Sequence, residues 1–259
     1  MELSLYQVDA FANKPFEGNS AAICPLDEWL PVDLMQSIAN ENNLSETAFF
    51  VKKNGRFHIR WFTPTNEVNL CGHATLASAY VIFNLLGYTE KKILFESMSG
   101  PLSVIRKGDL LIMDFPSCPP VKCDIPQAIL NAFDDTPVEC LKNDDYIVVF
   151  ENESSVFNAR PDLLQLTQLD LRGVIITSQS SQYDFVSRFF APNYGINEDP
   201  VTGSSFTQLA PYWASKLNIS QFKAKQISKR GGEVACELFG ERVLISGKAV
   251  MYMQGIIKI

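Results

Sequence analysis

Three residues suited to chemistry stand together near the middle of the first half of the chain. Cys71, Gly72 and His73 come directly before a run of uncharged, mostly apolar residues. A helix that is apolar on all sides must be buried, and about 14 residues are too few to span a bilayer. The run therefore predicts a core helix over 73–86 that Gly87 closes. Its N-terminus offers free backbone N–H groups and the positive end of the helix dipole, which suit a carboxylate ligand.

Glu46 is the candidate general base. Apolar residues follow it at 48–50, and a carboxylate partly withdrawn from water holds a proton more tightly than usual. That property suits removing a proton from carbon and returning it elsewhere on the same face. The alternative is an N-cap or exposed turn glutamate, which is common wherever Ser precedes Glu.

His73 falls in the first turn of the predicted helix. The helix dipole disfavours an imidazolium there, so we expect a neutral ring that donates or accepts a hydrogen bond. The alternative is a packed histidine with a single backbone partner.

Composition narrows the class of protein. The 259 residues are 46% hydrophobic and carry a net charge of −7, which suits one or two globular domains and argues against nucleic acid as a partner. No run reaches transmembrane length, and the N-terminus lacks the basic start of a signal peptide. The six cysteines show no CxxC spacing, so we expect reduced thiols in the cytoplasm. Two histidines are too few for a His-rich metal site, and we expect neither a metal nor a cofactor.

The elements that must position these residues follow from periodicity and turn signals. Pro116, Pro119 and Pro120 interrupt the pattern near the midpoint and predict a boundary between domains 1–115 and 116–259. The first domain is predicted to contain a helix over 31–42, the core helix, and strands at 2–10, 20–24, 43–51, 57–62, 92–98, 101–106 and 109–115. The second is predicted to contain helices near 126–133, 155–168 (interrupted at Pro161) and 204–218, strands at 137–142, 145–150, 173–178 and 184–190, and four strands over 222–259.

An internal repeat relates the two halves. Residues 60–71 align without a gap on residues 188–199, and glycines further along match at a similar offset. This alignment places Cys71 opposite Asp199, each just before a buried helix. Two such halves facing each other would aim two helix N-termini at one cleft, where an anionic ligand would be bound from both sides. Glu46 has no counterpart in the second half, which suggests an asymmetric reaction.

These stretches resemble the PhzF-like family of phenazine-biosynthesis isomerases over the whole chain. The most specific matches are Leu70-Cys71-Gly72-His73-Ala74-Thr75 and Glu198-Asp199-Pro200-Val201-Thr202-Gly203-Ser204. Further matches are Val8-Asp9-Ala10-Phe11, Gly18-Asn19-Ser20-Ala21-Ala22, Ser45-Glu46-Thr47-Ala48-Phe49 and Phe62-Thr63-Pro64. The family often has Pro where this chain has Ser20, a minor departure.

The resemblance implies an α+β fold like that of diaminopimelate epimerase. It consists of two similar domains, each an antiparallel β-barrel wrapped around a central α-helix, and the first also takes up the last strand near 250–259. It also implies cofactor-free proton-shift chemistry, typified by isomerisation of trans-2,3-dihydro-3-hydroxyanthranilate, and usually a homodimer. Glu46 would then shuttle the proton, with His73 and Asp199 lining the pocket. Gly72, Gly203 and Ser204 would bind the substrate anion through backbone N–H groups, with the Ser204 hydroxyl adding a contact.

We therefore predict a cytoplasmic, cofactor-independent isomerase that acts on a small cyclic or amino-acid-like carboxylate. One alternative is a thiol-dependent amino-acid epimerase or racemase using Cys71. Related enzymes use two thiols, one from each half, and Asp199 at the second position speaks against that. A helix N-terminus can lower the pKa of a thiol such as Cys71, but a small buried residue is the preferred interpretation. Another alternative is a non-enzymatic small-ligand-binding or stress-related protein on the same fold.

Overall fold

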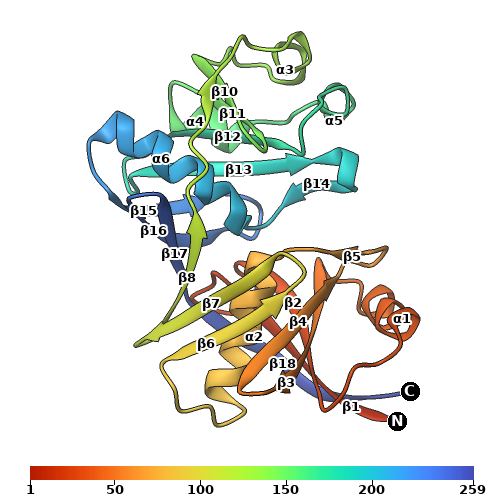
Figure 1. The fold of residues 1–259 in the computed structure, drawn as a ribbon. Helices are drawn as coiled ribbons and strands as arrows, with labels where there is room; N and C mark the ends of the chain where they lie inside the picture. The colour runs from red at the N-terminus through yellow and green to blue at the C-terminus, as the bar shows by residue number, and fades with distance from the viewer. The chain divides into compact units, whose positions relative to one another are not determined.

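The computed structural model describes all residues from 1 to 259 and shows a mixed α/β fold dominated by β-strands (Figure 1). The chain forms two compact units. The first combines residues 1–114 with residues 246–259, and the second is the continuous stretch 115–245. Helices of 11 and 13 residues pack against the strands of the first unit, and one of 12 residues packs against those of the second.

The first unit is built on strands whose pairings follow one path. The strands pair in the order β18, β1, β2, β3, β4, β6, β7, β8, and the short β5 pairs with β4. Their bounds are β1 Glu2–Ala10, β2 Asn19–Leu26, β3 Glu46–Lys53, β4 Arg56–Phe62, β5 Glu67–Val68, β6 Lys92–Ser97, β7 Gly100–Lys107, β8 Leu110–Pro116 and β18 Ala249–Lys258, with helices α1 Val32–Asn42 and α2 Gly72–Asn84.

The second unit repeats this path. Its strands pair in the order β9, β10, β11, β12, β13, β15, β16, with β14 on β13. Their bounds are β9 Val121–Lys122, β10 Glu139–Lys142, β11 Tyr146–Val149, β12 Val174–Gln179, β13 Phe185–Ala191, β14 Ile196–Asp199, β15 Gln221–Gln226, β16 Gly232–Phe239 and β17 Arg242–Gly247. The helices are α3 Gln127–Ala132, α4 Glu153–Asn158, α5 Leu163–Leu166 and α6 Phe206–Leu217, with 3-10 turns η1 Pro192–Tyr194 and η2 Gly203–Ser205.

The predicted antiparallel barrels need correction. In both units the third and fourth strands of the path run parallel after two antiparallel pairs: β2 with β3, and β11 with β12. A further parallel pair follows, β4 with β6 and β13 with β15. A helical segment lies between the strands of each parallel pair, and such a crossover brings the chain back in the same direction. The sheet does not close, so the barrels are not confirmed.

The shared order of parallel and antiparallel pairs supports the internal repeat, but the gapless alignment of its motifs is wrong. Trp61 pairs with Val68 between β4 and β5, and Phe189 pairs with Asp199 between β13 and β14. Asp199 therefore corresponds to Val68. The residue that corresponds to Cys71 is Thr202, since each is the N-cap of the helical segment that follows.

The misalignment has a local cause. The second unit has three extra residues between its paired strands, the 3-10 turn Pro192–Tyr194, which Gly195 closes with φ +75°. In each unit the two residues that flank this stretch of chain form an ion pair. Arg60 binds both carboxylate oxygens of Glu67 at 2.6 and 2.7 Å, and Arg188 binds both of Glu198 at 2.6 and 3.1 Å.

The predicted core helix is confirmed as α2. It begins at Gly72 and ends at Asn84, two residues before the predicted end, and Gly87 turns the chain beyond it with φ +67°. Ten of its thirteen residues are buried, because the uncharged sequence meets strands of the first unit on several sides, β1, β2 and β3 among them. In Figure 1 it lies among these strands. Helix α1 likewise follows Pro31, as predicted.

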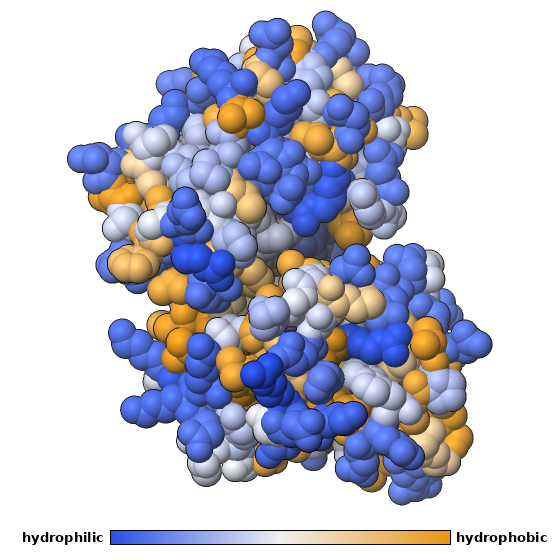
Figure 2. All heavy atoms as spheres, in the orientation of Figure 1, coloured by the Kyte–Doolittle hydropathy of each residue, from blue (hydrophilic) through white to orange (hydrophobic).

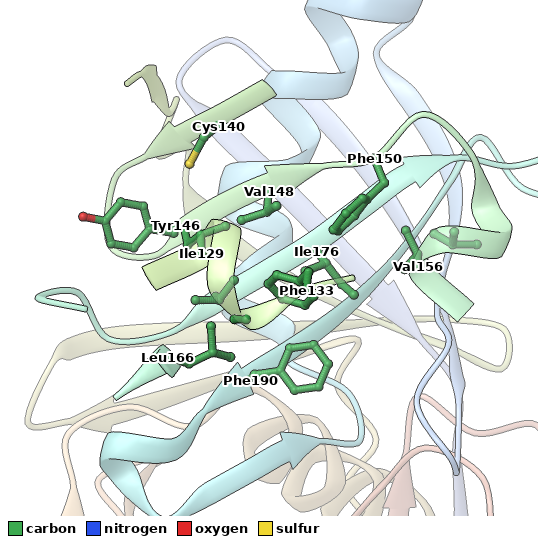
Figure 3. Close-up of a cluster of buried hydrophobic side chains, with 13 residues drawn as sticks. Ile129, Phe133, Cys140, Tyr146, Val148, Phe150, Val156, Leu166, Ile176 and Phe190 are labelled. Carbon is green, nitrogen blue, oxygen red and sulfur yellow. The ribbon is translucent and has the colours of Figure 1, made fainter. Parts of the chain in front are cut away.

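The second unit has its own hydrophobic core between its sheet and the short helices α3, α4 and α5 (Figure 3). Phe133, Phe150 and Phe190 are large members of that core, and the rings of Phe133 and Phe150 meet edge to face. Helix α6 begins at Phe206, after the 3-10 turn, and not at the predicted Ser204.

Hydrophilic residues cover most of the face drawn in Figure 2, and apolar residues appear among them in separate groups. Exposed apolar side chains scattered in this way are normal for a folded domain. None of the helices combines the length and the apolar character that a membrane crossing requires.

Candidate active site

Three of the candidate residues meet inside the first unit. Glu46 is the first residue of β3, Cys71 is the N-cap of α2, and His73 lies in the first turn of α2. The buried apolar residues of α2 and β3 pack together, and this packing brings side chains that are 27 positions apart into contact. Gly72 stands between Cys71 and His73, at the first position of the helix.

The contact between Glu46 and His73 is close and nearly dry. Oε2 of Glu46 lies 2.9 Å from Nε2 of His73, and the two side chains are only 13% and 7% exposed. The distance suits a hydrogen bond, yet buried Oε2 has no partner in hydrogen-bonding geometry. We read the short distance as an ion contact in which the oxygen lies off the N–H direction, because a bond needs both distance and alignment. That oxygen therefore contacts His73 and keeps a lone pair that can accept a further bond.

The other ring nitrogen of His73 faces Asn19, at the start of β2. Asn19 Nδ2 lies 3.3 Å from His73 Nδ1, and Ser45 Oγ donates to Asn19 Oδ1 at 3.1 Å. The Ser45 contact assigns the amide orientation, with the NH2 group toward the ring. In a neutral ring Nδ1 then accepts, and the proton resides on Nε2, beside Glu46.

The surroundings of His73 act on its pKa in opposite directions. Burial alone lowers the pKa of His73, but the charges of Cys71 and Glu46 raise it, and the net pKa is well above the usual value. At neutral pH the carboxylate is the relevant charge, because the thiol is not ionised there. The sequence argument considered the helix dipole alone, and a carboxylate at 2.9 Å outweighs it.

Cys71 is a buried thiol and not an activated nucleophile. Burial, and then the charge of Glu46, raise its pKa to about 11, although His73 acts in the opposite direction. Its Sγ lies 3.6 Å from His73 Nδ1 and 4.0 Å from Nε2. The position equivalent to it in the second unit is Thr202, which has no thiol. Both observations oppose a two-thiol mechanism.

The remaining predicted residues lie in the second unit. Asp199 ends β14, its carboxylate accepts a hydrogen bond from Thr202 Oγ1, and its backbone oxygen accepts one from Gln226 at 2.7 Å. Gly203 and Ser204 form the 3-10 turn before α6. The structure thus places Glu46, Gly72 and His73 in one unit and these three residues in the other.

A charged network at this turn was not predicted from the sequence. Arg172 NH1 donates to Ser204 Oγ at 3.0 Å, and its Nε and NH2 groups bind the two oxygens of Asp145. Asp145 is fully buried and also accepts from Gln208 at 2.7 Å. These residues are 27 to 63 positions apart, so no local motif could have revealed them. Asn19 and Ser45 fall within the quoted motifs, but no role had been predicted for either.

Comparison with known proteins shows the family of the chain. The family model for phenazine biosynthesis-like proteins matches residues 8–255. The chain belongs to this family. A relative from Pseudomonas aeruginosa named an uncharacterized isomerase is 52% identical over 98% of both chains. The crystal structure of a PhzF-family phenazine biosynthesis protein from Enterococcus faecalis matches with 44% identity and a TM-score of 0.98, covering all of both chains.

A more distant match shows the fold alone. The structure of a hydroxyproline epimerase from Agrobacterium vitis is 8% identical with a TM-score of 0.61, covering 99% of this chain and 92% of that one. The chain thus shares its architecture with an epimerase. At that identity, the roles of the epimerase's site residues cannot be assigned to residues of this chain.

Proposed function

We propose that this phenazine biosynthesis-like protein is a cofactor-independent isomerase that moves a proton on a small cyclic or amino-acid-like carboxylate. One observation supports this most directly: Oε2 of Glu46 is buried, lies beside His73 and has no aligned hydrogen bond. A carboxylate oxygen left open in a nearly dry site is well placed to accept a proton from a bound substrate.

The reaction needs few groups. Glu46 takes a proton from a substrate carbon, and the electron pair of that C–H bond stays on the substrate as an enolate-like anion. The carboxylic acid formed on Glu46 then returns the proton to a different carbon, which restores the carboxylate. His73 lies 2.9 Å from Glu46 and is held on its other side by Asn19, so it positions the base and balances its charge. The first N–H groups of α2, at Gly72 and His73, are suited to the substrate anion.

The residues of the second unit enter this proposal through the family motif. Asp199 would orient the substrate, and Gly203 and Ser204 would bind its anionic group. Arg172 holds the Ser204 hydroxyl at 3.0 Å and so would fix its direction. A homodimer and a cytoplasmic location remain predictions from the family resemblance.

The test is a deuterium-exchange screen over a library of small carboxylates, read by mass spectrometry. Wild-type protein is expected to move deuterium at carbon in at least one compound. Glu46→Gln keeps the size of the side chain and should lower that rate by about 10²- to 10⁴-fold, the usual contribution of a general base. Glu41→Gln, on the exposed face of α1, is the control and should retain the wild-type rate. A Glu46→Gln variant with wild-type exchange would show that the base is another residue.

A further inference from the structure

We propose that Glu46, Cys71 and His73 form a three-ligand site for Zn²⁺, and that a bound zinc ion inhibits the protein. The three residues supply one carboxylate oxygen, one sulfur and one imidazole nitrogen, all within 4.8 Å of one another. Sulfur and imidazole are the ligands that zinc prefers over calcium or magnesium, and carboxylate completes many zinc sites. No metal was expected from the sequence, because two histidines are too few for a His-rich site, but this mixed set needs only one histidine.

The distances fit a zinc ion after small side-chain movements. Zinc lies about 2.0–2.2 Å from nitrogen and oxygen ligands and about 2.3 Å from sulfur. In a tetrahedral site the nitrogen and oxygen are then roughly 3.3 Å apart, and nitrogen and sulfur roughly 3.5 Å. Here Nε2 and Oε2 are 2.9 Å apart, while Nε2 and Sγ are 4.0 Å apart. The oxygen must withdraw by about 0.4 Å and the sulfur approach by about 0.5 Å to reach zinc geometry.

The missing hydrogen bond of Glu46 Oε2 is a second observation. Oε2 of Glu46 is buried without an aligned hydrogen bond, although a ring nitrogen lies 2.9 Å away. A buried carboxylate oxygen in that condition is costly unless another group binds it. An ion between Oε2, Nε2 and Sγ would satisfy it. The ligands also come from defined elements, since β3 holds Glu46 and the start of α2 holds Cys71 and His73.

Charge balance favours a divalent ion. The positive end of the α2 dipole opposes a cation, but the carboxylate of Glu46 and the thiolate of Cys71 supply two negative charges that offset it. A coordinating thiol gives up its proton to the solvent, and Nε2 of His73 must also be free of its proton to bind. Three protein ligands leave the fourth position for water or for a carboxylate ligand.

Inhibition follows from the identity of the ligands. A zinc ion bound to Oε2 occupies the lone pair that would accept the substrate proton. This consequence rests on the proposed isomerase function, whereas zinc binding itself does not. The chemical class of the inhibitor is a thiophilic divalent cation, with zinc as the probe.

The binding experiment uses the full chain with reduced thiols. Zinc is titrated against a chromophoric chelator for wild type, Cys71→Ser and two controls. Cys236→Ser changes a buried cysteine in the second unit, and Cys123→Ser breaks the pair with Cys140, whose sulfurs are 3.8 Å apart. Wild type should bind one ion. Loss of a residue that only hydrogen-bonds to a metal ligand typically weakens metal binding by about 10- to 100-fold. Cys71→Ser removes a ligand itself, so zinc binding should weaken by at least about tenfold. Both controls should bind as wild type.

Two further readouts separate the inference from the proposed function. Cobalt in place of zinc should give a thiolate charge-transfer band in wild type and Cys236→Ser but not in Cys71→Ser. Zinc should suppress deuterium exchange by wild type, and a chelator should restore it, while Cys71→Ser should respond far less relative to its own metal-free rate. Equal zinc affinity in wild type and Cys71→Ser, or loss of binding in Cys123→Ser, would overturn the site. Binding that depends on Cys71 without any effect on exchange would support the site and refute its inhibitory role at Glu46.

Discussion

The buried carboxylate of Asp145 makes Arg172 the most informative residue for testing stability. Asp145 is 0% exposed, and Arg172 binds both of its oxygens while its own side chain stays 37% exposed. Replacing Arg172 by Met keeps most of the apolar stem and removes the guanidinium. Asp145 would then keep only its contact with Gln208, at 2.7 Å.

The size of the effect follows from burial. Breaking a buried ion pair by removing one partner costs about 3–5 kcal/mol. We expect the lower end, about 3 kcal/mol, because Gln208 remains and water can enter where Arg172 was partly exposed. For a chain of this size that lowers the melting temperature by about 6–12 °C. Arg172→Lys keeps the charge but loses the two-pronged geometry, and should cost about 1.5 kcal/mol.

The assay is urea unfolding followed by circular dichroism, with thermal melts in parallel. The control is Arg160→Met, since Arg160 is exposed and contacts only the backbone oxygens of Asn158 and Ala159; its change should stay within about 0.5 kcal/mol. Adding Asp145→Asn to Arg172→Met should restore part of the stability, because no buried charge is left unpaired. A loss below about 1 kcal/mol in Arg172→Met would refute the reasoning, since it would place the ion pair in the weak class of exposed pairs.

Two more predictions concern the first unit. Because the folded pKa of His73 is raised, its contribution to stability is complete below the unfolded value of about 6.5 and is lost as the pH rises through the folded pKa. Urea midpoints of the wild type should therefore fall more steeply above neutral pH than those of His73→Gln, and equal slopes would contradict the assignment. Iodoacetamide at pH 8 should modify Cys71, whose pKa is about 11, more slowly than the partly exposed Cys118. Peptide mass spectrometry gives both rates, and faster labelling of Cys71 would show an activated thiol.

Local signals made much of the fold predictable from the sequence. Pro31 marks the start of α1, and the uncharged run after Gly72 has only one stable place, inside the first unit. The side-chain types of Glu46 and His73 were also enough to suggest what each could do chemically. The distance between the two side chains could not be predicted, because it depends on how β3 packs against α2.

The errors came from features that a linear reading does not detect. Gapless alignment of the repeat placed Asp199 opposite Cys71. The residues before the inserted 3-10 turn Pro192–Tyr194 match so well that the three extra residues did not show as a gap. The antiparallel barrels came from the family resemblance, and the alternation of apolar residues could not correct them because it does not report strand direction. The pKa of His73 was judged from the helix dipole alone, because the nearest charge, Glu46, lies 27 positions earlier.

The pairing of β1 with β18 has a consequence for the order in which the protein is made. The two strands pair from Glu2 with Lys258 to Ala10 with Ala249, and the backbone N–H of Ile259 reaches the carbonyl of Met1 at 2.8 Å. A ribosome therefore releases all of the second unit before the first receives its last strand. Until then one edge of β1 lacks its partner, and an open edge can pair with another chain. The first unit thus begins before the second along the chain and is completed after it.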